Sequence, residues 1–188
     1  KFSLQSDYAK LWDLNNKNCS ESIFEIQFAE TTSSSQPYSK YWAMFTPLDN
    51  RIVTAWGAGM NQVSDDLWNA YEPNDPRRDA SIANGYETAQ GTHVATRYCI
   101  KWKDTEAPVN SLRELARNNF IVLRYADVLL MLTEATGDVQ YLNEVRHRVG
   151  LPGYGEAGYP AEYNTVTLAL QHEYQVELGM EFQRWFVL

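Results

Sequence analysis

Residues 118–135 read NNFIVLRYADVLLMLTEA, and this stretch decides the fold. At about 100° per residue its apolar side chains surround a helix almost completely, while Arg124, Asp127 and Glu134 fall within roughly 80° of one another. A helix of this kind is buried on most sides and exposes a narrow polar seam. The pattern predicts a central core helix over Phe120 to Ala135, too short to span a bilayer, which takes about 20 apolar residues.

A second helix follows directly. Gly137 interrupts the first pattern, apolar residues then recur at helical spacing up to Val149, and Gly150 follows. Two helices joined by a tight turn are antiparallel neighbours. We therefore predict a core helical hairpin over 118–149 and a closing helix over 164–188, within a mainly α chain.

Shorter elements decorate this helical frame. Ser22 to Phe28 alternates in a way that suits a strand with Ile26 and Phe28 directed inward. Val63 to Glu72 predicts an amphipathic helix that Ser64 caps. The fold class is therefore mainly α, with long loops and a few short strands.

Composition limits the classes of partner. The chain has 188 residues and a formal net charge of −8. Nucleic-acid backbones and anionic membrane surfaces need clustered Lys and Arg, so neither is expected as a partner. Cys19 and Cys99 have no metal spacing, which predicts two buried thiols, or one disulfide in an oxidising compartment. We expect no cofactor and no metal site.

Paired carboxylates are candidates for acid–base chemistry, because a pair of them hydrolyses glycosidic bonds in many enzymes. Glu173, Glu177 and Glu181 recur every four residues on one predicted helix face. The pattern favours a solvated or ion-paired stripe, and Asp127 and Glu134 beside Arg124 favour a structural ion-pair network. No nucleophile elbow or phosphate loop is present in the sequence, so a non-catalytic protein is predicted.

A long irregular segment, residues 31–61, is the best binding candidate. Loops of this length are usually functional or disordered, and its aromatic content argues against disorder. Flat rings stack on the apolar C–H faces of sugars while polar groups fix the hydroxyls. The alternative is that each ring closes a satellite core beneath the loop. The candidate ligand-binding residues are the rings and polar side chains of Tyr38, Tyr41, Trp42, Trp56, Asn50 and Arg51.

Three ordered motifs resemble one known family. Residues 118–131 closely resemble the "RYADVLLM" helix of SusD/RagB outer-membrane nutrient-binding lipoproteins, and residues 141–152 resemble that family's "LNEVRxRAGLP" helix. Residues 173–188 are similar to its closing "ERRxELxFEGxRWFDL" segment. Three motifs in order are far more specific than one short match. Residues 20–28 and the "DPRR" turn at 75–78 resemble further segments of the family.

The resemblance implies a fold and a function. It implies the C-terminal portion of a SusD-like domain over 1–188, part of an α/α superhelix with TPR-like helix pairs. It implies a non-catalytic lipoprotein at the cell surface of the outer membrane, held by a lipid anchor outside this chain. Such a protein binds oligosaccharides or polysaccharides and delivers them to a SusC-like TonB-dependent transporter. A peptide-binding RagB-like role and a protein-interaction scaffold without a sugar site remain alternatives.

The closing segment departs from the family pattern at several positions. Where the motif usually has two arginines, this chain has Tyr174 and Gln175. Its usual glycine is Phe182, and its usual aspartate is Val187. These departures concern local helix packing.

Overall fold

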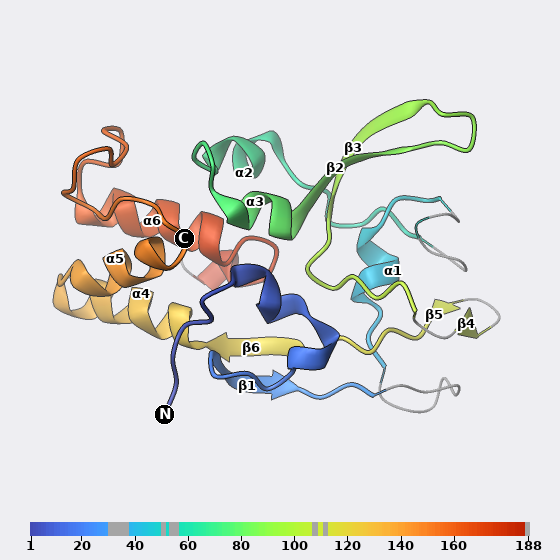
Figure 1. Ribbon diagram of the computed structural model, residues 1–188, viewed down its shortest axis with the longest axis horizontal. Helices are drawn as coiled ribbons and strands as arrows, with labels where there is room; N and C mark the ends of the chain where they lie inside the picture. Colours follow the sequence, from blue (N-terminus) through green and yellow to red (C-terminus); the bar gives the residue numbers. More distant parts are fainter. Residues whose placement is uncertain (30–37, 50–51, 53–56, 107–108, 111–112, 187–188) are drawn as a thin grey trace.

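The computed structural model describes residues 1–29, 38–49, 52, 57–106, 109–110 and 113–186 (Figure 1). The longer helices gather at one end of the molecule, and the hairpin of residues 82–99 extends toward the other end. The helices are α1 (Tyr41–Phe45), α2 (Asp65–Ala70), α3 (Pro76–Ser81), α4 (Tyr125–Thr136), α5 (Gln140–Arg148) and α6 (Val166–Glu177), with 3₁₀ turns η1 (Tyr8–Trp12), η2 (Leu14–Asn16) and η3 (Arg184–Phe186). The strands are β1 (Ser22–Ile26), β2 (Ile82–Glu87), β3 (His93–Cys99), β4 (Val109–Asn110), β5 (Arg113–Glu114) and β6 (Phe120–Arg124).

Helices α4, α5 and α6 form the main core. Gly137 ends α4 in the left-handed conformation at φ 74°, and its N–H donates to the Thr133 carbonyl. Glycine adopts this conformation without the steric cost of a Cβ. The two helices that follow pack on α4 through fully or nearly fully buried side chains, namely Ala126, Leu129, Leu130, Leu142, Val145, Ala169, Leu170, Tyr174 and Leu178.

The helix prediction for residues 120–124 is wrong. These residues form β6, which pairs antiparallel with β1, Ile26 opposite Phe120 and Ser22 opposite Arg124. The run Phe-Ile-Val-Leu suits a strand as well as a helix, because aromatic and branched side chains pack well on a pleated surface. The pairing with β1 decides between them, and the core helix begins only at Tyr125.

The predicted strand at 22–28 forms, but its inward face differs from the prediction. Ile26 is 47% exposed, whereas Glu25 is 8% exposed. Register shifts interrupt the ladder on both sides of Phe24. The Glu25 carboxylate accepts from Asn119 Nδ2 at 2.6 Å and from the Asn18 N–H at 3.1 Å. These hydrogen bonds satisfy a buried carboxylate and hold the strand in this orientation.

The closing helix is shorter than predicted. Helix α6 ends at Glu177, and the chain then turns through Met180 and Phe182, both at φ 67°. A non-glycine residue with a bulky side chain at positive φ is a backbone outlier that costs on the order of 1–2 kcal/mol. The turn places Glu181 in the protein interior at 3% exposure and leaves the Phe182 side chain partly exposed.

Helix α2 and the long β2–β3 hairpin lie on one side of α6 (Figure 1). The predicted cap is confirmed, because Ser64 Oγ accepts from the Leu67 N–H at 3.2 Å. The hairpin is tied to α2 by Arg97, whose guanidinium lies 4.5 Å from the Trp68 ring centroid. Trp68 also contacts the Arg78 guanidinium at 4.8 Å, so two cations flank one indole.

Candidate functional site

The structure separates the predicted ligand residues. Asn50, Arg51 and Trp56 lie outside the described residues. Trp42 is 2% exposed and packs with Tyr98 and Ala116, so it has no free face for a ligand. Trp42 therefore occupies a satellite core, the alternative that the sequence left open for each ring.

The other two predicted rings are less buried. Tyr38 is half-buried and lies 5.6 Å from Lys40 Nζ. Tyr41 is half-buried at the start of α1, and desolvation raises the pKa of its hydroxyl above the ordinary value. Tyr41 is the predicted residue whose surroundings are most fully described.

Tyr41 belongs to an aromatic cluster built from four separate parts of the chain. Its ring centroid lies 5.3 Å from that of Trp102, 5.4 Å from that of Phe120 and 5.7 Å from that of Phe182. Offset and tilted ring pairs at such distances are favourable. Trp102 is 3% exposed and forms the base, whereas Phe182 is 44% exposed. We call Tyr41, Phe45, Trp102, Phe120 and Phe182 the aromatic cluster.

A cleft of about 420 Å³ adjoins this cluster, between α2 and the C-terminal end of α6. Phe182 lines the cleft and also contacts the Tyr41 ring, so the two features are continuous. The rest of the lining is mixed: Asn61, Gln62, Asp66 and Gln175 are polar, whereas Leu67, Leu178 and Met180 are apolar. An exposed ring beside amides and a carboxylate is the chemistry that binds a polar ligand with an apolar face.

The glutamates considered for acid–base chemistry belong to a buried ion-pair cluster instead. Glu173 and Glu177 are fully buried, and Glu181 is 3% exposed. Arg124 Nη1 contacts Glu177 at 2.5 Å, and its Nε contacts Glu181 at 2.9 Å. We call the whole group the central ion-pair cluster: Glu21, Glu72, Asp75, Arg77, Lys101, Arg124, Arg146, Arg148, Glu173, Glu177 and Glu181.

The cations of the central ion-pair cluster lower the pKa values of two of its carboxylates, Glu177 and Glu181. Burial by itself raises the pKa of Glu177, but the attraction of Arg148, Arg124 and Arg77 outweighs it and holds that pKa well below the ordinary value. Burial likewise opposes ionisation of Glu181, and Arg124 and Lys101 together lower its pKa. A buried, paired carboxylate with a lowered pKa is poorly suited to act as a general acid, so we assign Glu177 and Glu181 a structural role.

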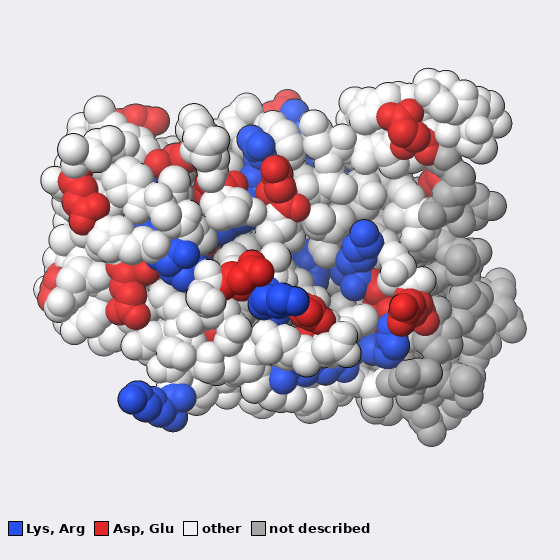
Figure 2. All heavy atoms as spheres, in the orientation of Figure 1, with Lys and Arg blue, Asp and Glu red and all other residues white. Residues whose placement is uncertain are grey.

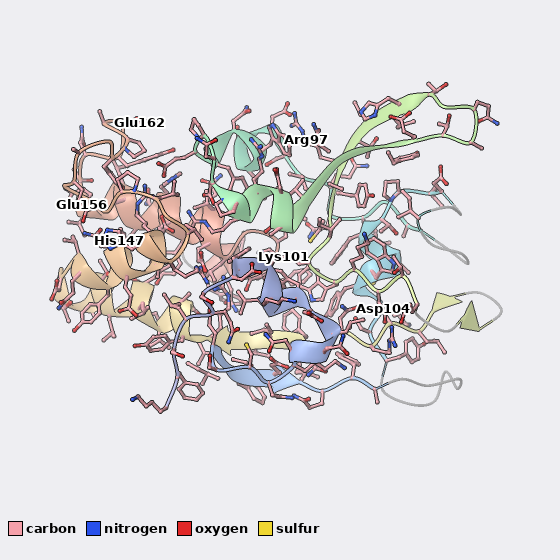
Figure 3. All side chains as sticks on the ribbon, viewed as in Figure 1. Arg97, Lys101, Asp104, His147, Glu156 and Glu162 are labelled. Atoms are coloured by element: carbon pink, nitrogen blue, oxygen red, sulfur yellow. The ribbon has the colours of Figure 1, made fainter. Side chains whose placement is uncertain are left out.

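The cluster also explains the family motifs. Each of the five motif-like stretches supplies at least one of its charges: Glu21 from 20–28, Arg77 from 75–78, Arg124 from 118–131, Arg146 from 141–152 and Glu177 from 173–188. Figure 3 labels another member, Lys101, beside η1. Its ammonium donates to Glu181 Oε1 at 2.7 Å and to the Gly179 carbonyl at 2.6 Å. The sequence signal for this cluster is that arginine or glutamate occurs in each of the motif-like stretches.

Asp127 does not join Arg124 in an ion pair, contrary to the predicted network on the seam of the core helix. Asp127 is 7% exposed, and desolvation raises the pKa of its carboxyl group to about 6 despite the attraction of Arg124. Glu134 is exposed and accepts from the Tyr174 hydroxyl at 3.5 Å. Arg124 pairs with glutamates of other elements, which leaves Asp127 as a buried carboxyl group at a stability cost.

We expect Asp127→Asn to stabilise the protein at pH 7. The folded state holds the Asp127 proton up to about pH 6, whereas the unfolded chain releases it near the ordinary value of 3.8. Raising the pH through this window therefore removes stability from the wild type and not from the variant. Because water screens part of the cost, we expect a gain of about 1–2 kcal/mol at pH 7. Urea unfolding at pH 4 and pH 7 measures it.

The matched control is Glu134→Gln, on the same helix but exposed. This variant should leave the pH profile between 4 and 6 unchanged. Destabilisation by Asp127→Asn at pH 7 would show that the carboxylate makes a favourable contact and would contradict the assignment.

The described residues contain no group of three or more His, Cys, Asp or Glu side chains arranged to hold a metal ion. His147 pairs with Glu156, their nearest atoms 3.0 Å apart, near the end of α5 (Figure 3). Both described cysteines, Cys19 and Cys99, are free thiols, and burial raises the pKa of Cys99 to about 11. Among the described helices, none is long and apolar enough to cross a membrane.

Charged side chains alternate in sign on the face shown in Figure 2. Lysines and arginines there lie next to aspartates and glutamates rather than forming one continuous basic area. The charges of opposite sign are therefore interspersed on this face.

Comparison with known proteins identifies the family. The model of the SusD family matches residues 81–188. SusD-like protein P2 of Formosa agariphila is 25% identical over 218 residues, which cover 97% of this chain and 42% of that protein. The solved structure of a laminarin-binding SusD-like protein is 26% identical with a TM-score of 0.79, covering 98% of this chain and 45% of that one.

A second solved structure agrees in fold. NanU of B. fragilis gives a TM-score of 0.74 at 24% identity, over 100% of this chain and 46% of that one. The chain thus spans less than half the length of these three relatives. The resemblance drawn from the sequence motifs is confirmed, and the chain belongs to the SusD family.

Proposed function

We propose that this chain is part of a non-catalytic, surface-exposed protein that binds a glycan. The carrying observation is the aromatic cluster, in which Phe182 is 44% exposed and lines the cleft, and the half-buried Tyr41 packs beside it. Aromatic faces contact the C–H faces of sugar rings, and nearby amides fix hydroxyl groups. A laminarin-binding relative with the same fold adds support for a carbohydrate ligand.

The mechanism is capture without bond cleavage. Glu177 and Glu181, whose pKa values the neighbouring cations lower, supply no proton to a glycosidic oxygen. A preformed ring surface, in contrast, binds a sugar with little ordering cost. The motifs of the SusD/RagB family support delivery of the captured oligosaccharide to a SusC-like TonB-dependent transporter at the outer membrane. A lipid anchor outside this chain would hold the protein at that surface.

Affinity electrophoresis in gels containing laminarin, starch or xylan tests glycan binding. We expect at least one polysaccharide to retard the protein. Tyr41→Ala should weaken that retardation about tenfold, the scale of one aromatic contact, while Tyr41→Phe keeps it. Circular dichroism melts confirm that each variant is folded.

Phe2→Ala is the control, because it removes an accessible aromatic ring that lies outside the aromatic cluster. Its retardation should equal that of the wild type. If no polysaccharide retards the wild type and oligopeptides bind instead, the proposal is wrong and the peptide-binding alternative is supported. If neither binds, the scaffold alternative is supported.

A further inference from the structure

We propose that the cleft between α2 and α6 is a binding subsite for a neutral sugar unit, with Phe182 as its stacking surface. The proposal rests on the proposed glycan-binding function and names the place and the ligand charge. It is carried by three independent features of the cleft: its backbone, its polar lining and its charge.

The backbone conformation of Phe182 is strained, and it leaves the Phe182 ring exposed. Phe182 adopts φ 67°, a conformation that glycine reaches without strain and a large side chain rarely adopts. The motif that this segment resembles has glycine at this position. Here the chain instead carries a ring that is 44% exposed and lines the cleft. A strained residue that presents an exposed side chain at a cleft indicates a role for that side chain.

The polar lining is free to accept a ligand. Gln175 is half-buried on α6, and within the described part of the chain its amide has no hydrogen-bond partner. Asn61 and Gln62, at and just after the end of the irregular segment 31–61, add further side-chain amides to the lining. Each amide offers both a donor and an acceptor, which matches the vicinal hydroxyl groups of a sugar. A cleft of about 420 Å³ is large enough for sugar units and far larger than a water site.

The charge of the lining selects a neutral ligand. Asp66 is an acidic lining residue, and no lysine or arginine lines the described cleft. Two positions where the resembled motif usually has arginine are Tyr174 and Gln175 here, and both line the cleft. Without the two arginines of the motif, the cleft lacks the cations that would attract a sugar carboxylate or sulfate at these positions. The departures at Tyr174, Gln175 and Phe182 therefore meet at one place, together with Met180, which stands where the motif has phenylalanine.

The test restores the motif residues one at a time. Phe182→Gly and Gln175→Arg are titrated by isothermal calorimetry with an oligosaccharide of whichever polysaccharide, laminarin, starch or xylan, retards the wild type. Each should weaken binding about tenfold, because one removes the ring and the other fills the cleft with a longer side chain. Phe182→Gly should change the melting temperature little, since relief of backbone strain offsets lost ring packing.

Two variants serve as matched controls. Phe2→Gly removes a ring of equal exposure, and Gln90→Arg adds the same charge on the exposed β2–β3 turn, far along the chain from the cleft. Both should bind like the wild type. If Phe182→Gly fails to fold, the affinity of Gln175→Arg tests the proposed subsite by itself, because Gln175 lies outside the aromatic cluster.

The outcomes separate the two proposals. If the wild type binds tightly and Phe182→Gly and Gln175→Arg bind with the same affinity, the cleft is not the sugar subsite. The proposed glycan-binding function is then unaffected. Tighter binding of an acidic oligosaccharide, such as oligogalacturonate, than of any neutral one also overturns the cleft as described. Failure of the wild type to bind any glycan overturns both.

Discussion

Replacing Arg124 by methionine should lower the free energy of unfolding by about 3–5 kcal/mol, the range for removal of one partner from a buried ion pair. Arg124 is 1% exposed and contacts three glutamates, Glu21 at 2.8 Å, Glu177 at 2.5 Å and Glu181 at 2.9 Å. Methionine fills similar volume but leaves these carboxylates with fewer cations. Urea unfolding followed by circular dichroism at pH 7 measures the change.

The control for this prediction is Arg97→Met. Arg97, labelled in Figure 3, also makes an ion pair, with Asp65 at 2.6 Å, but the Asp65 side chain is 86% exposed. An exposed pair contributes less than about 1 kcal/mol, because water solvates both charges. If Arg124→Met costs no more than Arg97→Met, the central ion-pair cluster does not hold the fold together. If Arg124→Met does not fold, Glu181→Gln gives a milder measure of the same cluster.

Acidification should unfold the protein through the same cluster. Glu177 and Glu181 have pKa values below the ordinary value of 4.5 in the folded state, because the neighbouring cations outweigh burial. Their contribution is therefore complete above about pH 4.5 and disappears as the pH falls through the lowered folded-state pKa values. We expect a loss of more than about 2 kcal/mol between pH 5 and pH 3.

Urea unfolding at a series of pH values measures this loss, and Glu177→Gln should flatten it. The salt dependence supplies a second check. Buried pairs are screened less than exposed ones, so 0.5 M sodium chloride should change the stability at pH 7 only slightly. A stability profile that is flat from pH 5 to pH 3 would contradict the assignment. The opposite slope expected from Asp127 lies between pH 4 and 6 and is removed separately by Asp127→Asn.

Local sequence determined the parts of the fold whose interactions are local. Helical periodicity and Gly137 define α4 and its end, since the pattern and the left-handed glycine both act within one or two turns. Ser64 determined the start of α2 through a hydrogen bond three residues away. The ordered motifs likewise determined the family, because several short matches in order identify it before any contact is known.

Only the tertiary structure decided the features that depend on distant residues. Residues 120–124 became a strand because β1 lies beside them, and Trp42 became core because Tyr98 and Ala116 cover it. The spacing of Glu173, Glu177 and Glu181 was compatible with a surface stripe, but in the structure arginines from three other elements, α3, β6 and α5, pair with Glu173 and Glu177. The cleft arises in the same way, from Asn61 and Gln175 on separate elements. Periodicity records which face a residue occupies, but burial and pairing depend on which distant element covers that face.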